Sequence, residues 1–272
     1  MVAESLGPGT RVGRVDLRVT DLERALGFYR DVLGFAAESP GDDESVTLSA
    51  GGPAVLRLVD GAPAGIPPSG ATGLFHTAFL YPARADLAEA VGRVATSGLR
   101  LTGASDHGVS EALYLHDPDG NGVELYADRA VEDWPRQPDG SIDMFTAPLD
   151  LHDLVAAAGG RARIPSPGAP VPAGTTVGHV HLKVADVERA ARFYEDEVGL
   201  ALMARMPQAA FLAGGGYHHH VGANTWQSLG GSPPPPGSAG LERYELRVPA
   251  GAEARTLRDP DGIEVVVVPD ES

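Results

Sequence analysis

An internal duplication is the feature that most constrains the fold of this chain. Residues 12–35, VGRVDLRVTDLERALGFYRDVLGF, and residues 177–200, VGHVHLKVADVERAARFYEDEVGL, match at 13 of 24 positions without a gap. In each copy an alternating apolar strand leads to an aspartate at a helix N-cap position, Asp21 or Asp186, and then to apolar residues at helical spacing. The chain is therefore predicted to contain repeated strand–helix modules, each continued by short β-rich runs.

A weaker repeat lies inside the first. GLFHTAFLYP (73–82) and SEALYLHDPDGNGVELYAD (110–128) flank a helical stretch, and GLERYELRVP (240–249) with LRDPDGIEVVVV (257–268) repeats them without the helix. The two repeats together predict an α+β protein of four βαβββ modules, of which the fourth is truncated. The modules span about residues 12–60, 73–128, 177–228 and 240–270.

The domain boundaries follow from these modules. Residues 1–135 hold modules one and two, and residues 175–272 hold modules three and four. Residues 136–174 form an irregular segment between them. It contains one helical piece at about 149–158 and the Pro/Gly-rich linker RIPSPGAPVPAG at 163–174.

Composition excludes several functional classes. The chain has no cysteine, so disulfides, thiolate nucleophiles and Cys-ligated metals are ruled out, and any metal must be held by His and carboxylate. A net charge of −16 argues against nucleic acid or an anionic membrane as a partner. The sequence shows no apolar run of membrane-spanning length and no signal-peptide pattern, so we expect a cytoplasmic protein.

The modules carry a family resemblance. The opening HVHLKVADVERAARFYEDEVGL and the closing LYLHDPDGNGVELYADR resemble the vicinal oxygen chelate superfamily, which includes glyoxalase I, bleomycin-resistance proteins and type I extradiol dioxygenases. The combination of GLFH, VGHVHL and GGYHHHVGANTW is most similar to the bacterial catechol 2,3-dioxygenases of the CatE type. The resemblance implies that modules pair into two half-barrels of mixed β-sheet with flanking helices, with a metal ion in the cleft.

The resemblance also implies a set of metal ligands. Type I extradiol enzymes hold their metal with a His on the first strand of each paired module and a Glu on the last strand of one of them, which is the facial triad of non-haem Fe(II). The matching residues here are His76, His179 and Glu124. Fe(II) is therefore the expected metal, with Mn(II) or another divalent ion as the alternative. Taken singly, a His that opens a strand is more often a buried structural residue than a ligand.

The other two modules lack these ligands. Arg14 and Arg243 occupy the first-strand positions of modules one and four, and a cation beside a divalent metal is electrostatically unfavourable. We therefore expect modules two and three, 73–128 with 177–228, to form the metal-bearing half-barrel, and modules one and four to form a metal-free one. Pairing modules three and four instead would leave a single His with Glu264 as ligands.

A run of three histidines poses a separate question. The run is predicted to lie in a strand, where alternation places His218 and His220 on one face and His219 on the other, so the three cannot share one site. The resemblance implies that His219 is the acid–base residue beside the metal, and the ordinary pKa of histidine suits proton transfer. A polar strand edge and adventitious metal affinity are the alternatives.

Further pocket residues follow from alternation and from the resemblance. His181 lies two residues after His179 and so shares its face, which makes it a candidate pocket residue or hydrogen-bond partner of a ligand. The resemblance implies that Tyr114 hydrogen-bonds a metal-bound substrate oxygen, whereas its alternative role is that of a hairpin aromatic. The resemblance also places Asp106 and His107 in the region that lines the pocket.

The predicted function is extradiol ring cleavage of a catechol-like aromatic diol with Fe(II) and O2, by a chain that is a monomer or a homo-oligomer. Two alternatives belong to other classes. A glyoxalase-type isomerase or lyase usually has four protein ligands, whereas three ligands with a nearby His favour oxygen chemistry. A non-catalytic, small-molecule-binding resistance protein would not need the three ligands together.

Overall fold

The computed structural model describes residues 3, 5–38, 44–159 and 168–270, so residues 163–167 of the predicted linker lie outside the described part. Module one contains β1 (Arg11–Arg18), α1 (Leu22–Leu26), η1 (Gly27–Val32), β2 (Ala36–Ala37), β3 (Ser45–Ser49) and β4 (Ala54–Val59). Module two contains β5 (Gly73–Leu80), α2 (Arg84–Ser97), β6 (Gly103–Asp106), β7 (Ser110–His116) and β8 (Gly122–Asp128). The connecting segment contributes η2 (Val131–Asp133), β9 (Ala147–Pro148) and α3 (Leu151–Ala157).

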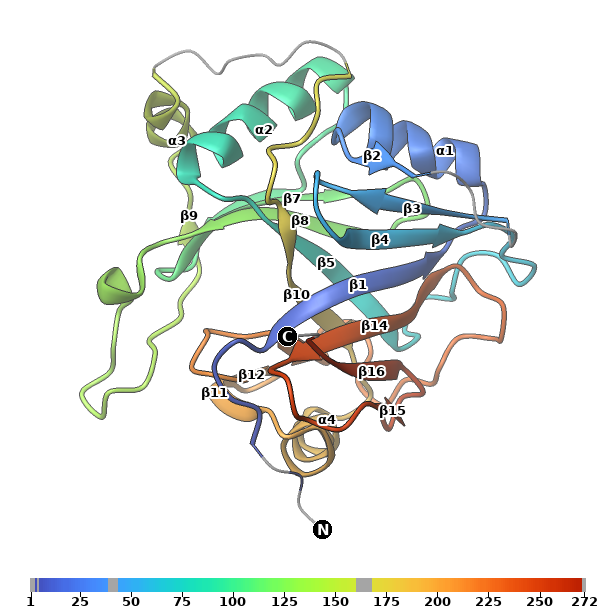
Figure 1. The fold of residues 1–272 in the computed structure, drawn as a ribbon, viewed down its shortest axis with the longest axis vertical. Helices are drawn as coiled ribbons and strands as arrows, with labels where there is room; N and C mark the ends of the chain where they lie inside the picture. Colours follow the sequence, from blue (N-terminus) through green and yellow to red (C-terminus); the bar gives the residue numbers. More distant parts are fainter. Residues whose placement is uncertain (1–2, 4, 39–43, 160–167, 271–272) are drawn as a thin grey trace.

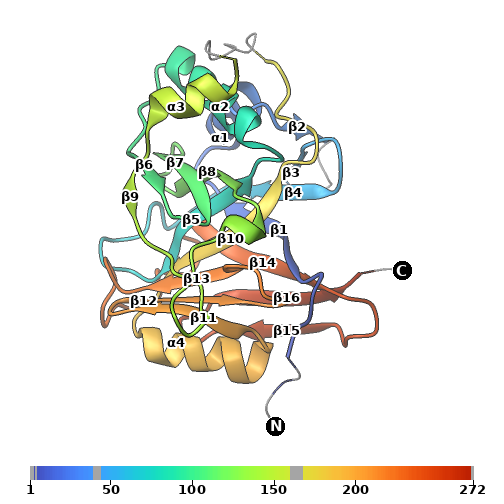
Figure 2. The ribbon, with the colours of Figure 1, turned by 90° about the vertical axis from the view of Figure 1, so that its left-hand side faces the viewer.

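The second half of the chain repeats this order. Module three contains β10 (Thr176–Lys183), α4 (Val187–Phe193), η3 (Tyr194–Val198), β11 (Ala201–Met206), β12 (Ala209–Ala213) and β13 (Val221–Asn224). Module four, which is described throughout, consists of β14 (Gly240–Val248), β15 (Arg255–Arg258) and β16 (Glu264–Pro269). Figure 2 shows α1, α2 and α3 at one end of the molecule and α4 at the opposite end.

Two mixed sheets each combine strands from both halves of the chain (Figure 1). One sheet has the order β11-β12-β13-β10-β5-β8-β7-β6-β9, so that modules two and three meet at the antiparallel pair β5–β10. The other has the order β15-β16-β14-β1-β4-β3-β2, so that modules one and four meet at the antiparallel pair β1–β14. We call them the two–three half-barrel and the one–four half-barrel. The predicted fold class is confirmed.

One continuous apolar cluster joins the two half-barrels. Strand β1 packs against β10, and the cluster includes Leu17 of β1, Phe79 of β5, Val180 of β10 and Leu246 of β14, all fully buried. Because both sheets contribute to this core, the two halves of the chain share their main apolar core. Within the described residues, no helix combines the length and apolar character that crossing a membrane requires.

The first helix of each duplicated module begins as the sequence predicts. The Asp21 carboxylate accepts a hydrogen bond from the Arg24 backbone N–H, and Asp186 accepts one from Arg189, both at 2.9 Å. Each helix then continues as a π-helical segment, η1 or η3, where the apolar spacing alone predicts a regular α-helix. These segments carry two fully buried tyrosines.

The buried tyrosines anchor the turn that precedes the last strand of the next module. The Tyr29 hydroxyl donates to Asp117 Oδ2 at 3.0 Å, and the Tyr194 hydroxyl donates to Asp259 Oδ2 at 3.2 Å. Each aspartate opens a DPDG turn and also accepts hydrogen bonds from backbone N–H groups inside it. The first of these turns leads directly into β8, so the duplicated helix of module one helps to position Glu124.

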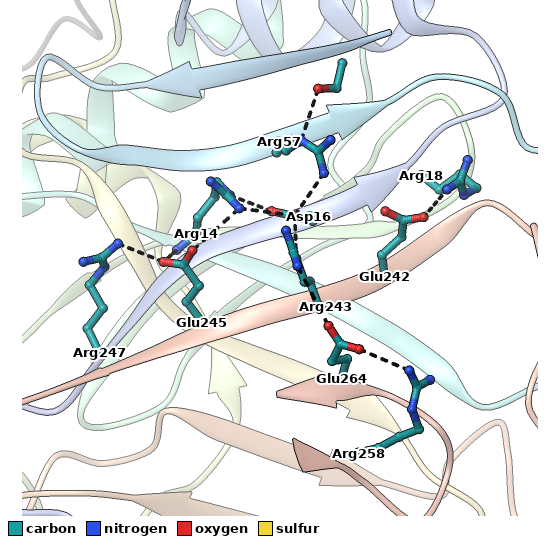
Figure 3. A network of polar contacts seen from close by, with 11 residues as sticks. Arg14, Asp16, Arg18, Arg57, Glu242, Arg243, Glu245, Arg247, Arg258 and Glu264 are labelled. Atoms are coloured by element: carbon teal, nitrogen blue, oxygen red, sulfur yellow. Dashed lines mark hydrogen bonds and ion pairs between the residues drawn. The ribbon is translucent and has the colours of Figure 1, made fainter. Parts of the chain in front are cut away.

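Ion pairs occupy the one–four half-barrel at the strand positions that correspond to the predicted metal site (Figure 3). In the duplication, Arg14 stands where module three has His179. Asp16 is buried and accepts hydrogen bonds from Arg14 Nε at 2.7 Å and Arg243 Nε at 2.9 Å. Arg57 Nη1 lies 3.4 Å from the same carboxylate. One carboxylate thus partly neutralises several guanidinium groups, and a divalent ion beside these cations would be electrostatically unfavourable.

Replacing Asp16 with Asn is expected to destabilise the protein. The three arginines would lose their shared counter-ion, and because they are between 20% and 40% exposed, water would screen part of the effect. We expect the free energy of unfolding to fall by about 2–3 kcal/mol in urea titrations. Glu264→Gln is the control, because Glu264 pairs mainly with the exposed Arg258 and should cost less than about 1 kcal/mol. Equal losses for the two variants would contradict this account.

Candidate metal centre

Three adjacent strands bring His76, Glu124 and His179 together on one face of the two–three half-barrel. Ala78 of β5 is the register partner both of His179 on β10 and of Glu124 on β8. His76 lies two residues before Ala78 on the same strand and therefore faces the same side. The three predicted ligands lie around this small, fully buried alanine, which leaves space above it.

The donor atoms have the spacing of one face of a metal coordination sphere. His76 Nε2 lies 2.9 Å from Glu124 Oε2, His179 Nε2 lies 3.3 Å from the same oxygen, and the two Nε2 atoms are 3.3 Å apart. Metal–ligand bonds of about 2.1 Å at right angles would separate neighbouring ligand atoms by about 3.0 Å. All three residues are buried. Two imidazoles and one carboxylate in this arrangement fit a divalent metal ion.

The charge states of these groups also suit metal binding. Burial opposes ionisation of Glu124, but its contacts with His179 and His76 outweigh burial and hold its pKa well below the usual value. Burial lowers the pKa of His179 to about 4, although Glu124 acts in the opposite direction. At neutral pH the carboxylate is therefore ionised and His179 is neutral, and these are the forms that bind metal ions.

A cavity of about 450 Å³ opens onto the three residues. Its apolar lining comes from several elements and includes Leu74, Phe75, Met144, Phe145, Met206, Phe211 and Trp226. Its polar lining includes Tyr114, His107, His181, His219 and Lys183. The cavity therefore combines aromatic walls, suited to a flat ring, with a small set of polar groups close to the donor atoms.

The predicted pocket residues divide into two groups. Tyr114, His107 and His181 line the cavity, and His107 Nε2 lies 2.7 Å from the Tyr114 hydroxyl. Asp106 does not line it. Its carboxylate forms two hydrogen bonds with the guanidinium of Arg129, at 2.7 and 2.8 Å, on the other face of β6. The prediction for Asp106 is wrong because Ser105, its neighbour within β6, lines the cavity, and neighbours on a strand point to opposite faces.

His181 is the ring partner of His76 across the β5–β10 pair. The two residues are in register, with ring centroids 4.9 Å apart. His181 is buried, and its Nε2 has no hydrogen-bond partner among the described residues. Burial, followed by the neighbouring histidines, lowers the pKa of His181 well below its usual value. A neutral His181 thus lines the cavity and keeps one buried ring nitrogen without a hydrogen-bond partner among the described residues.

The histidine run does not lie in a strand. Strand β13 begins only at Val221, and the chain bends at His218 and His220 after Gly215 and Gly216, which both have positive φ. The predicted separation of His218 from His219 is therefore wrong, because alternation applies only inside a hydrogen-bonded strand. Their Nδ1 atoms are 2.7 Å apart.

His219 does lie at the cavity. It is among the lining residues, and its ring centroid is 4.1 Å from that of His179. His220 is not among the cavity-lining residues, and its Nδ1 accepts a hydrogen bond from the Gly214 N–H at 3.2 Å. Burial, followed by the neighbouring histidines, lowers the pKa of His219 well below its usual value. A neutral imidazole at this place can accept a proton.

The sequence reasoning missed two residues near the site. Lys183, the only lysine in the chain, lines the cavity from the strand that carries His179 and His181, and strand alternation from His179 could have found it. Asp128, four residues after Glu124 on β8, contacts His218 at 2.9 Å. Only its tertiary contact distinguishes Asp128 from the other aspartates of the chain.

Comparison with known proteins shows the family to which the chain belongs. The chain matches the family model of the Glyoxalase/Bleomycin resistance protein/Dioxygenase superfamily over residues 11–125. It is 37% identical to the catechol-2,3-dioxygenase of Bacillus subtilis (strain 168) over 249 residues, which cover 90% of this chain and 85% of that protein. The chain belongs to this superfamily. The resemblance seen in the sequence motifs is thus confirmed.

The chain is less similar to several other relatives than to the catechol-2,3-dioxygenase of Bacillus subtilis. Biphenyl-2,3-diol 1,2-dioxygenase 3 of Rhodococcus globerulus is 32% identical over 126 residues, which cover 43% of this chain and 63% of that protein. A solved structure from Bacillus subtilis has a TM-score of 0.63 at 12% identity and covers 99% of this chain and 87% of that one. Glyoxalase I of Zea mays has a TM-score of 0.54 at 18% identity, with 96% and 92% covered. These structural likenesses show the fold alone.

Proposed function

We propose that this superfamily member is an extradiol ring-cleavage dioxygenase that opens a catechol-like aromatic diol with Fe(II) and O2. The observation that carries the proposal is the grouping of His76, Glu124 and His179 within 4.8 Å beside an aromatic-walled cavity. The similarity to catechol-2,3-dioxygenase over 90% of the chain supports the same reaction class.

The three ligands would hold the metal from one side. Fe(II) bound there supplies coordination positions for the diol and for O2 and allows electron density to pass between them. Mn(II) or another divalent ion is the alternative occupant, because the donor set alone does not distinguish between them. The Glu124 carboxylate contributes the one negative charge that partly neutralises the ion.

The chain's own residues would bind the diol and move its protons. His219 can accept a proton from a diol hydroxyl and return it later in the reaction. Burial, followed by the charge of Glu124, raises the pKa of Tyr114 well above its usual value, so the phenol stays protonated and can donate a hydrogen bond to a substrate oxygen. Phe75, Phe211 and Trp226 would hold the ring and exclude water from the reacting atoms.

The two alternative functions receive less support. Within the described residues, the group of possible ligands contains three members, whereas a glyoxalase-type site usually has four. A resistance protein that only binds its ligand would not require a buried, ionised carboxylate against two imidazoles, because this arrangement costs desolvation free energy unless a metal ion is bound.

The test is to purify the protein without oxygen and measure its metal content, oxygen uptake and product absorbance. We expect about one iron per chain, and one O2 consumed for each catechol opened to a yellow ring-cleavage product. Isomerisation of a thiol adduct of a 2-oxoaldehyde without oxygen uptake would instead support the glyoxalase-type alternative. Binding of small aromatics without turnover, at full iron occupancy, would support a binding protein.

A further inference from the structure

A chain of hydrogen bonds extends from His219 away from the cavity. His219 Nδ1 lies 2.7 Å from His218 Nδ1, and His218 Nε2 lies 2.9 Å from Asp128 Oδ1. His218 is fully buried. Both of its ring nitrogens are therefore engaged by one neighbour each, so its orientation cannot change without breaking a buried hydrogen bond.

The direction of these bonds follows from counting protons. A carboxylate only accepts, so Nε2 of His218 must carry a hydrogen and donate it to Asp128. A neutral imidazole has one N–H, so Nδ1 of His218 is then an acceptor. The hydrogen between the two Nδ1 atoms must come from His219. The remaining nitrogen of His219, Nε2, is left without a hydrogen, and it is the ring nitrogen not turned to His218.

The opposite direction would require a positively charged His218. Both of its nitrogens would then donate, and His219 would carry its hydrogen on Nε2 instead. That cation would lie next to His219, with its ring centroid 6.2 Å from that of His179. A divalent metal bound at His179 would repel it at this short distance. The neutral arrangement is therefore the one that a metal-loaded site favours.

The carboxylate at the end of the chain is itself held in place. The Tyr217 hydroxyl donates to Asp128 Oδ2 at 2.9 Å, and it lies 2.8 Å from the Tyr126 hydroxyl. The Tyr126 hydroxyl reaches this place because residue 178 is glycine. A Cβ at that position would come within 1.6 Å of the hydroxyl oxygen.

We propose that Asp128 and His218 are positioning residues that hold His219 as the tautomer protonated at Nδ1, so that its unprotonated Nε2 faces the cavity. We call the hydrogen-bonded chain Asp128–His218–His219 the relay. The two tautomers of His219 have the same charge, so the relay determines only which ring nitrogen of His219 is free to take a proton. The role of His219 in turnover rests on the proposed dioxygenase function, whereas the tautomer itself does not. The relay explains why a second buried histidine, His218, lies beside His219.

The test is ¹⁵N NMR of the histidine rings in protein loaded with the diamagnetic ion Zn(II), with the His219 signals assigned by their absence in His219→Gln. The wild-type chain should show His219 protonated at Nδ1. In His218→Phe, which keeps a ring but loses the acceptor, and in Asp128→Leu, His219 should populate the tautomer protonated at Nε2. His220→Phe is the matched control from the same run, and it should leave the His219 signals unchanged.

Activity gives a second measurement. In iron-loaded protein, His218→Phe should lower kcat about 10- to 100-fold, the usual effect of losing such a supporting partner, with iron content and KM little changed. Asp128→Asn retains an acceptor oxygen for His218 and should recover much of the rate lost in Asp128→Leu. Should His218→Phe fail to fold, the comparison of Asp128→Leu with Asp128→Asn tests the proposal alone.

The results separate this inference from the proposed function. Protonation of wild-type His219 at Nε2, or a tautomer unchanged in both His218→Phe and Asp128→Leu, would overturn the relay even if catechol is cleaved. The expected tautomers in a protein that cleaves no diol would instead leave the relay standing and reject the dioxygenase.

Discussion

Glu124→Gln is expected to reduce bound iron from about one per chain to a small fraction and to remove ring cleavage with it. The substitution keeps the shape of the side chain but deletes the one negative charge of the predicted ligand set. Two neutral imidazoles and an amide oxygen bind a divalent ion far more weakly, and we expect the affinity to fall by at least about 100-fold. Metal analysis after dialysis against a weak chelator measures the loss directly.

The chain contains a matched control for this prediction. Glu264 follows the DPDG turn of module four, as Glu124 follows the corresponding turn of module two. In the structure Glu264 lies in the one–four half-barrel, paired with Arg258 and near Arg243. Glu264→Gln should leave iron content and activity unchanged. Iron loss in Glu264→Gln, or full iron retention in Glu124→Gln, would show that the metal is not held where we predict.

His219→Gln is expected to lower kcat by about 10²- to 10⁴-fold, the usual contribution of a positioned acid–base group. The metal content should stay near one per chain, because His219 is not a predicted ligand. Stopped-flow measurement of product absorbance, with iron content determined on the same samples, gives both quantities.

His220→Gln is the comparison for the His219 substitution. The two residues are adjacent in the chain, and both are buried, but His220 bonds to the Gly214 backbone and not to the cavity. Its substitution should change kcat less than about 10-fold. Equal losses for the two variants would remove the acid–base role from His219, and loss of iron in His219→Gln would make it a ligand.

Much of the scaffold could be predicted from the sequence because its signals are local. An aspartate that caps a helix acts on backbone groups two or three residues away, so Asp21 and Asp186 are readable from the chain alone. The duplication then made the strand positions comparable between modules. The ligand pattern implied by the family resemblance, applied to these positions, singled out His76, His179 and Glu124, which the structure places together. Their role as ligands stays a prediction until the metal is measured.

Local rules failed where the chain leaves regular structure. Alternation separated His218 from His219, but two glycines with positive φ turn that segment before the strand begins, and the two rings meet. Alternation inside β6 places Ser105 and Asp106 on opposite faces, and only the structure shows that Ser105 faces the cavity.

The sequence by itself determined the module order, the helix caps and the strand positions of the predicted ligands, because periodicity and turn residues act over short distances along the chain. The tertiary structure decided which strands join the predicted module pairs: β5 pairs with β10, and β1 with β14. It also decided that Asp128 lies behind His218, and that Asp16 lies among the arginines of the one–four half-barrel. Each of these contacts joins residues tens to hundreds of positions apart, and the closed packing of two sheets around one core selects them.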